Sequence, residues 1–258
     1  MSNPMSCLCR RVRTATAAAL VAVVAIGGAA LPSARRAEAS SPVTPAVFTA
    51  PLAITNTYFP FTPGAVKVLT GRDGRDRLTD VDLYSETTRD FVLGAATVRC
   101  RVLYEMAFTD GGLVEISRNH FAQADDGTVY YFGEVVDIYQ DGAIVSHDGS
   151  WLVGGPGAGD PAETMTVTAP AVFMPANPEP GDVYQPEAVP GGPQETDTIR
   201  RVARTVKVPA GKYTGCIEVL EVTSDARETK WYAPGVGVIR AKTGAELSRL
   251  ESSTLRAK

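Results

Sequence analysis

Acid–base chemistry in this chain would depend on few side chains, because the sequence contains only two histidines, His120 and His147. Strand alternation would allow His120 to point inward with Val114 and Ile116. His147 directly precedes Asp148, and adjacent strand residues point to opposite faces, so these two do not form a catalytic dyad by themselves. We interpret both histidines as structural or solvated.

The sequence holds no complete motif for a metal or a cofactor. A two-histidine metal site completed by Glu134 or Asp137 is a weaker alternative. Acidic turn residues invite a calcium interpretation, but no EF-hand spacing accompanies them, so solvated turns explain them better. These turn residues are Asp73, Asp76, Asp80, Asp125 and Asp126. The common hydrolase, zincin and nucleotide-binding motifs are also missing. We therefore predict no metal and no cofactor.

Aromatic residues are the strongest indication of a binding site. They recur in the segments that would wall a barrel, namely Tyr130, Tyr131, Phe132, Tyr139, Trp151, Tyr184, Trp231 and Tyr232. Both alternation phases of residues 128–139 are largely apolar, so one phase would pack outward and the other would line a lumen. Aromatic walls with a few polar groups are typical of a small-molecule cavity. An ordinary filled core is an equally good interpretation.

The elements that must position these side chains are strands. Short runs rich in Val, Ile, Tyr, Phe and Thr alternate with Gly, Asp and Pro, and the Asp-Gly steps suit tight hairpins. The expected strands include 65–70, 78–84, 97–109, 113–121, 128–139 and 143–146. No segment beyond the N-terminal region has sustained helical periodicity. The pattern predicts an all-β fold, an antiparallel meander that forms a closed or half-closed β-barrel over residues 52–258 as one domain.

A weak internal repeat suggests that the barrel has two related halves. Residues 94–104 and 211–220 each begin with Gly, reach a Cys five or six residues later and continue as an alternating strand. If the halves are related, Cys100 and Cys216 occupy equivalent strands that would come together across a sheet or between two sheets. We expect a disulfide between them, and two buried free thiols are the alternative.

The N-terminal residues resemble an export signal. Three arginines precede an uncharged run rich in Ala and Val, and Ala37-Glu38-Ala39 supplies a cleavage site. We predict a signal peptide over residues 1–39, a flexible lead-in over 40–51 and a secreted or extracytoplasmic mature protein. The alternative is an uncleaved anchor, because residues 14–34 carry no charge.

The charge balance of the mature chain excludes one class of partner. Residues 40–258 carry 20 basic and 28 acidic side chains, and such a surface is unsuited to nucleic acid. A membrane partner is expected only through the N-terminal signal or anchor. The sequence does not indicate an oligomeric state.

Several phrases resemble an uncharacterised family of secreted, β-rich bacterial proteins. They are YFPFTPG at 58–64, YFGE at 131–134, MPANP at 174–178, VPAG at 208–211 and WYAPGVG at 231–237. Together they span most of residues 54–240. The resemblance implies a secreted β-rich fold but transfers no catalytic residue. The apolar, Gly-rich segment 186–193 departs from the more acidic sequence expected there.

Three functions fit these patterns. The first is an exported β-barrel that binds an apolar or amphipathic small molecule, with Tyr130, Phe132, Tyr139, Trp151, Trp231 and Tyr232 as ligand-binding candidates. The second is a cofactor-independent cyclase or isomerase in the same cavity, such as a pericyclic [4+2] closure of a polyketide-type substrate. Its catalytic candidates are His120, Glu134, Tyr131 and His147, and Trp231 would also be tested. The third is a structural or partner-binding envelope protein.

Overall fold

The computed structural model describes residues 46–256, and these residues form a single all-β sheet. The predicted signal peptide over residues 1–39 lies outside the described residues. Within them, no helix has the length and apolar character needed to cross a membrane. The all-β prediction is therefore confirmed.

Fifteen strands make up the sheet. The first eight are β1 (Val66–Asp73), β2 (Asp76–Leu93), β3 (Ala96–Thr109), β4 (Gly112–Gln123), β5 (Val129–Gln140), β6 (Ala143–Ser146), β7 (Trp151–Val153) and β8 (Met165–Val167). The others are β9 (Ala171–Met174), β10 (Val183–Ala188), β11 (Gln194–Val208), β12 (Gly211–Thr223), β13 (Arg227–Ala233), β14 (Gly237–Thr243) and β15 (Glu246–Ser253).

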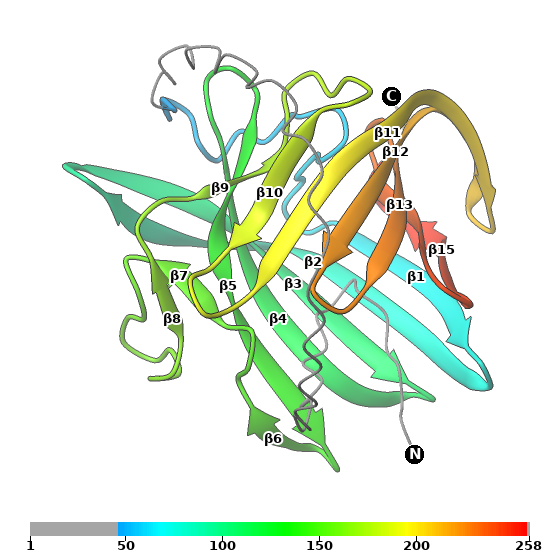
Figure 1. Cartoon of the computed structure of the whole chain (residues 1–258), viewed down its shortest axis with the longest axis horizontal. Coiled ribbons are helices and arrows are strands. Elements are labelled where there is room, and N and C mark those ends of the chain that lie inside the picture. Colours follow the sequence, from blue (N-terminus) through cyan, green and yellow to red (C-terminus); the bar gives the residue numbers. More distant parts are fainter. Residues whose placement is uncertain (1–45, 257–258) are drawn as a thin grey trace, which may run out of the picture.

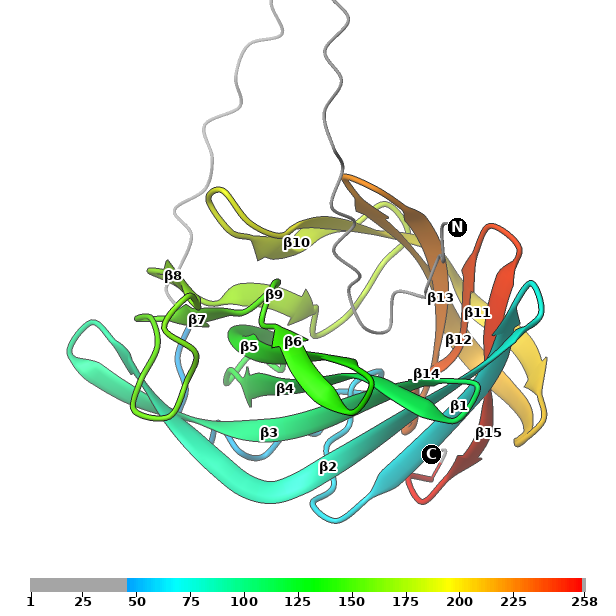
Figure 2. The same ribbon diagram turned by 90° about the horizontal axis from the view of Figure 1, so that it is seen from below.

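The sheet curls into a half-closed barrel. Its order is β10-β11-β12-β13-β14-β15-β1-β2-β3-β4-β5-β7-β8, and both β6 and β9 pair with β5. The pairing of β15 with β1 joins the two ends of the meander into one continuous wall. Figure 1 shows the long strands crossing the molecule, and Figure 2 shows how the wall bends round until β9 lies beneath β10. Backbone hydrogen bonds do not close the sheet there, although β9 and β10 are in contact.

The hairpin turns form where the sequence predicts them. Asp110 and Asp141 adopt left-handed backbone angles, with φ of 51° and 53°, and each is followed by a glycine that also has a positive φ. Asp and Gly tolerate this conformation better than most residues, so these steps reverse the chain between long strands. The turns thereby set the register that brings side chains together on the inner face.

Two apolar clusters cover opposite faces of the sheet. The inner cluster lies on the concave face and includes Phe121 and Tyr131. The outer cluster includes their sequence neighbours Ala122 and Phe132, which alternation turns to the other face. Phe48 packs on the outer cluster, with its ring centroid 5.7 Å from that of Phe132.

The predicted disulfide is wrong. Cys100 and Cys216 are both buried and unbridged. Cys100 belongs to the outer cluster on β3, and Cys216 belongs to the inner cluster on β12. In the sheet order, six strand pairings separate β12 from β3, an arc of about 29 Å at the usual strand spacing. The two thiols are also turned apart, because Cys100 belongs to the outer face of the sheet and Cys216 to the inner face.

Candidate functional site

A cavity opens on the concave face between the two walls of the half-barrel. Its volume is about 90 Å³. It is lined by Phe59, Lys67, Asp82, Tyr84, Leu103, Glu105, Asn119, Phe121, Tyr131, Glu134, Phe173, Pro186, Glu187, Glu195, Glu221, Lys230, Tyr232, Gly237 and Val238. These residues come from strands that are far apart in the sequence, so the curl of the sheet creates the site.

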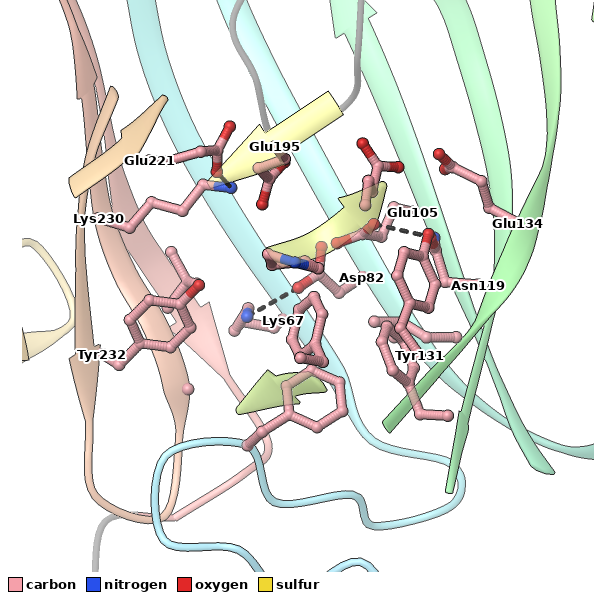
Figure 3. A pocket seen from close by; sticks show the side chains of 18 of the residues that line it. Lys67, Asp82, Glu105, Asn119, Tyr131, Glu134, Glu195, Glu221, Lys230 and Tyr232 are labelled. Carbon is pink, nitrogen blue, oxygen red and sulfur yellow. Dashed lines mark hydrogen bonds and ion pairs between the residues drawn. The ribbon is translucent and has the colours of Figure 1, made fainter. Parts of the chain in front are cut away.

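Acidic side chains outnumber basic ones in the cavity. Six carboxylates line it, namely Asp82, Glu105, Glu134, Glu187, Glu195 and Glu221, against two lysines, Lys67 and Lys230. Figure 3 shows Glu221, Lys230 and Tyr232 on one wall, and Asn119, Tyr131 and Glu134 on the wall opposite. Charges held away from water are costly unless they are paired, so this excess of acid is a physical feature that requires an explanation.

The ion pair between Lys67 and Asp82 crosses the floor of the cavity. Lys67 on β1 lies directly opposite Asp82 on β2, and Nζ is 2.7 Å from Oδ2. Burial alone would lower the pKa of Lys67, but the adjacent Asp82 raises it above its usual value, so the ammonium stays charged. Asp80 lies two residues away, and burial, reinforced by Asp82, raises its pKa to about 7. The Lys67–Asp82 pair of the floor therefore has a second acid, Asp80, as a neighbour outside the cavity lining.

A hydrogen-bonded chain runs along the other wall. The Asn119 amide donates to Glu105 Oε2 at 2.9 Å and to Ser117 Oγ at 2.8 Å, and the Tyr131 hydroxyl donates to the Asn119 carbonyl oxygen. Burial, followed by the charge of Asp82, raises the pKa of Glu105 to about 8. Glu105 is consequently protonated at neutral pH in the free protein, and it can lose that proton when a cation approaches.

A second group of acids occupies the wall formed by β11, β12 and β13. A carboxylate oxygen from each of Glu195, Asp197 and Glu221 lies within 4.8 Å of the others. Lys230 on β13 contacts Glu221, and its Nζ is 3.6 Å from Glu228. Burial and neighbouring acids raise the pKa of Glu195 well above its usual value and that of Asp197 to about 8. The single lysine does not balance these acids.

Aromatic rings form an apolar side of the cavity. Phe121 and Tyr131 stack with centroids 4.8 Å apart, and Phe173 approaches both rings, at 4.7 Å and 5.6 Å. Phe59 completes the group at 4.6 Å from Phe121. These contacts pack the rings against one another, so the cavity combines an apolar aromatic side with an acidic side.

The structure brings three of the predicted residues into the cavity. Tyr131, Glu134 and Tyr232 line it. Trp151 is buried behind the lining, where its indole nitrogen donates to Glu187 at 3.1 Å. Trp151 therefore orients a cavity carboxylate without lining the cavity itself.

Neither histidine lines the cavity. His120 is buried against Phe91 of the outer cluster, and its Nδ1 is 2.9 Å from the Gly133 carbonyl. Burial lowers the pKa of His120 to about 4, so the ring is neutral at physiological pH. His147 lies elsewhere, with Nδ1 2.8 Å from Asp137. The nearby Ser150 hydroxyl donates to the His147 carbonyl at 2.7 Å rather than to its ring, so these residues do not form a serine–histidine–aspartate relay.

The remaining predicted ligand-binding residues also lie outside the cavity lining. Tyr130 packs on Phe48, with centroids 5.5 Å apart, and Phe132 belongs to the outer cluster. Tyr139 is partly buried near the end of β5. Trp231 is covered by the Arg240 guanidinium, which lies 4.5 Å from its ring centroid. These side chains stabilise the wall from behind or from its rim.

Sequence reasoning missed most of the charged residues of the cavity. Lys67, Asp82, Glu105, Glu221 and Lys230 all line it. The sequence did contain a sign of this polar interior. One alternation phase of β2 holds Asp80, Asp82 and Tyr84, and charged side chains in the phase that is buried indicate a polar interior.

The chain is not matched by known proteins in these comparisons. No protein-family model, no curated protein and no solved structure matches it. The resemblance to secreted bacterial proteins therefore stays a prediction, and the cavity is the feature of the structure from which a function can be inferred.

Proposed function

We propose that the protein is an exported binding protein for an amphipathic small molecule that carries a basic group. The observation that carries this proposal is the cavity itself, in which six carboxylates face two lysines beside an aromatic surface. A ligand with an ammonium or guanidinium group would neutralise part of this excess, and its apolar part would pack on Phe121, Tyr131 and Phe173.

Glu105 is the carboxylate best placed to receive the basic group. It lines the cavity, and the Asn119 amide fixes one of its oxygens while Asn119 is itself held by Tyr131, a member of the aromatic group. Cation binding would convert the protonated Glu105 into a carboxylate, forming a charge-assisted contact in a site shielded from water.

The direct test compares three probes of similar shape and different charge. 2-Phenylethylammonium, neutral 2-phenylethanol and anionic 3-phenylpropionate would each be titrated into the mature protein by calorimetry at pH 7.5. We expect the ammonium to bind at least about tenfold more tightly than the alcohol, equivalent to about 1.4 kcal/mol, and the anion not to bind. Equal affinity for all three probes would contradict the assignment of a basic ligand.

Matched variants locate the binding group. Glu105→Gln keeps the shape and hydrogen bonds of the side chain but removes its capacity for negative charge, so we expect it to lower ammonium affinity about tenfold or more. Glu86→Gln changes an exposed glutamate outside the cavity and should bind like the unmodified protein. Native mass spectrometry of protein purified from its producing culture would then identify the retained natural ligand.

A cofactor-independent cyclase or isomerase is the second candidate, favoured by the same Glu105. A carboxyl group with a pKa of about 8, linked through Asn119 to Tyr131, can serve as a general acid or base near neutral pH. Incubation with a precursor of the retained molecule distinguishes the two functions. An enzyme would convert the precursor and lose turnover in Glu105→Gln, whereas a binding protein would return it unchanged.

A further inference from the structure

We propose that Glu195, Asp197 and Glu221 bind a calcium ion on the wall of the cavity. This inference goes beyond the proposed function, because it assigns a metal to Asp197 and to two of the six cavity carboxylates, whereas the basic group of the organic ligand is assigned to Glu105. Carboxylate oxygens are the ligands that hard divalent cations prefer, and no histidine or cysteine belongs to the group.

The sheet forces the three carboxylates together. Asp197 on β11 lies directly opposite Glu221 on β12, and Glu195 is two residues from Asp197, so alternation places it on the same face. Like charges directly opposite each other destabilise a pair of strands. A bound cation would turn this repulsion into attraction and explain why the strands tolerate the arrangement.

An unsatisfied oxygen supplies a second, independent observation. Asp197 is only 3% exposed, and its Oδ1 has no partner at normal hydrogen-bond geometry within the described residues, where the Tyr184 hydroxyl is the donor that approaches this carboxylate. A buried carboxylate oxygen without a partner is costly, because it has lost its water without gaining a replacement. Since Asp197 faces Glu221 across the ladder, a cation in the cluster would provide the missing contact.

The charges fit a divalent ion. Lys230 is the lysine that contacts the cluster, through Glu221, and it is shared with Glu228. With all three carboxylates ionised, as metal coordination requires, they and the one ammonium carry a net charge of −2, which a divalent cation would cancel. A monovalent cation would leave an acid uncompensated in a site that contains the buried Asp197.

The spacing favours calcium over magnesium. Two oxygens bound to one Ca²⁺ at about 2.3–2.6 Å lie no more than about 5 Å apart, whereas Mg²⁺ at about 2.0–2.1 Å limits them to about 4 Å. Here the oxygens lie within 4.8 Å of one another, a limit that matches the span across calcium and exceeds the span across magnesium. Glu195 is partly exposed, which leaves room for water to complete the coordination shell.

The test uses the mature protein after treatment with EDTA and dialysis, without any organic ligand. Calorimetric titration with CaCl₂ should show one ion per chain, and the melting temperature should rise with Ca²⁺ concentration. MgCl₂ should bind at least about tenfold more weakly. Extracellular calcium sites bind with dissociation constants of up to about 1 mM, so absence of binding at Ca²⁺ concentrations up to about 10 mM would overturn the assignment. Mg²⁺ binding as tight as that of Ca²⁺ would also overturn it.

Variants assign the ligands. Glu195→Gln and Asp197→Asn should each lower Ca²⁺ affinity about tenfold or more. Asp80→Asn replaces a buried acid on β2 that lies outside both the cluster and the cavity lining, and it should leave the affinity unchanged. Retained affinity in both cluster variants would overturn the proposal. If Asp197→Asn does not fold, the more exposed Glu195→Gln gives the answer alone. The calcium titration tests the metal site alone, and the phenylethylammonium titration with Glu105→Gln tests the organic-ligand site alone. Failure of one proposal is therefore distinguishable from failure of the other.

Discussion

Replacement of Lys67 by methionine tests the central electrostatic feature of the cavity. Methionine keeps much of the length and apolar stem of lysine but removes the ammonium, which is 2.7 Å from Asp82. The two side chains are 4% and 2% exposed, so Asp82 would be left as a buried charge with no water to replace its partner. Asp80 on the same strand would not compensate this charge, because two acids repel each other when both are ionised.

The expected cost follows from this burial. Removing one partner of a buried pair typically costs about 3–5 kcal/mol, because the remaining charge is uncompensated. For a domain of this size, each kcal/mol lowers the melting temperature by roughly 2–4 °C, so Lys67→Met should lower it by roughly 6–20 °C. The double variant Lys67→Met/Asp82→Leu removes both charges and should recover most of that loss.

Thermal unfolding followed by circular dichroism at pH 7.5 measures the effect. Arg99 and Asp90 supply a control pair, because their side chains are 58% and 45% exposed although the contact is 2.6 Å. Arg99→Met should leave the melting temperature almost unchanged, since water screens an exposed pair. The reasoning is refuted if Lys67→Met melts with the unmodified protein, or if the double variant is less stable than the single one.

Three further predictions concern the fold. Gly133→Ala should lower the melting temperature by several °C, because a Cβ at Gly133 would lie 2.1 Å from a backbone oxygen of β7. Gly111→Ala should lower it far less, because a Cβ at Gly111 would meet open space. Equal effects of the two substitutions would contradict this reasoning. Burial raises the pKa of Asp80 from 3.8 to about 7, so the folded protein keeps a proton that the unfolded chain loses, and stability falls as pH rises from about 4 to about 7. Asp80→Asn should therefore be more stable than the unmodified protein at pH 8.5, and this advantage should shrink as the pH is lowered toward 4, as measured by thermal melts. Denatured mature protein, alkylated without reductant, should gain two labels, at Cys100 and Cys216, in its mass spectrum; no labelling would restore the disulfide.

The strands were predictable wherever turns bounded an alternating run. Residues 143–146 match β6, and 113–121 lie within β4. The prediction ended a strand at Tyr84, whereas β2 continues to Leu93 through a register shift between Tyr84 and Thr88. That continuation is polar and largely exposed around the shift, so it carries no apolar alternation for a sequence pattern to detect.

The sequence predicts the wrong inward-facing side for β4. Apolar Val114 and Ile116 suggested the inner phase, together with His120. The structure places Asn119 and Phe121 in the cavity instead, and turns His120 to the outer cluster. The rule that apolar residues face inward fails here because the half-barrel surrounds a polar cavity, and only the pairing of distant strands reveals which face is enclosed.

The seam between β9 and β10 has a mechanical consequence for the range of ligands. Within the described residues no backbone hydrogen bond joins these two strands, although they are in contact. Any other widening of the wall would break a ladder of backbone hydrogen bonds, whereas opening here gives up side-chain contacts alone. Under the proposed binding function, this seam is the part of the wall that widens at the lowest cost, and the size of the largest ligand is set by how far the seam opens rather than by the volume of the resting cavity.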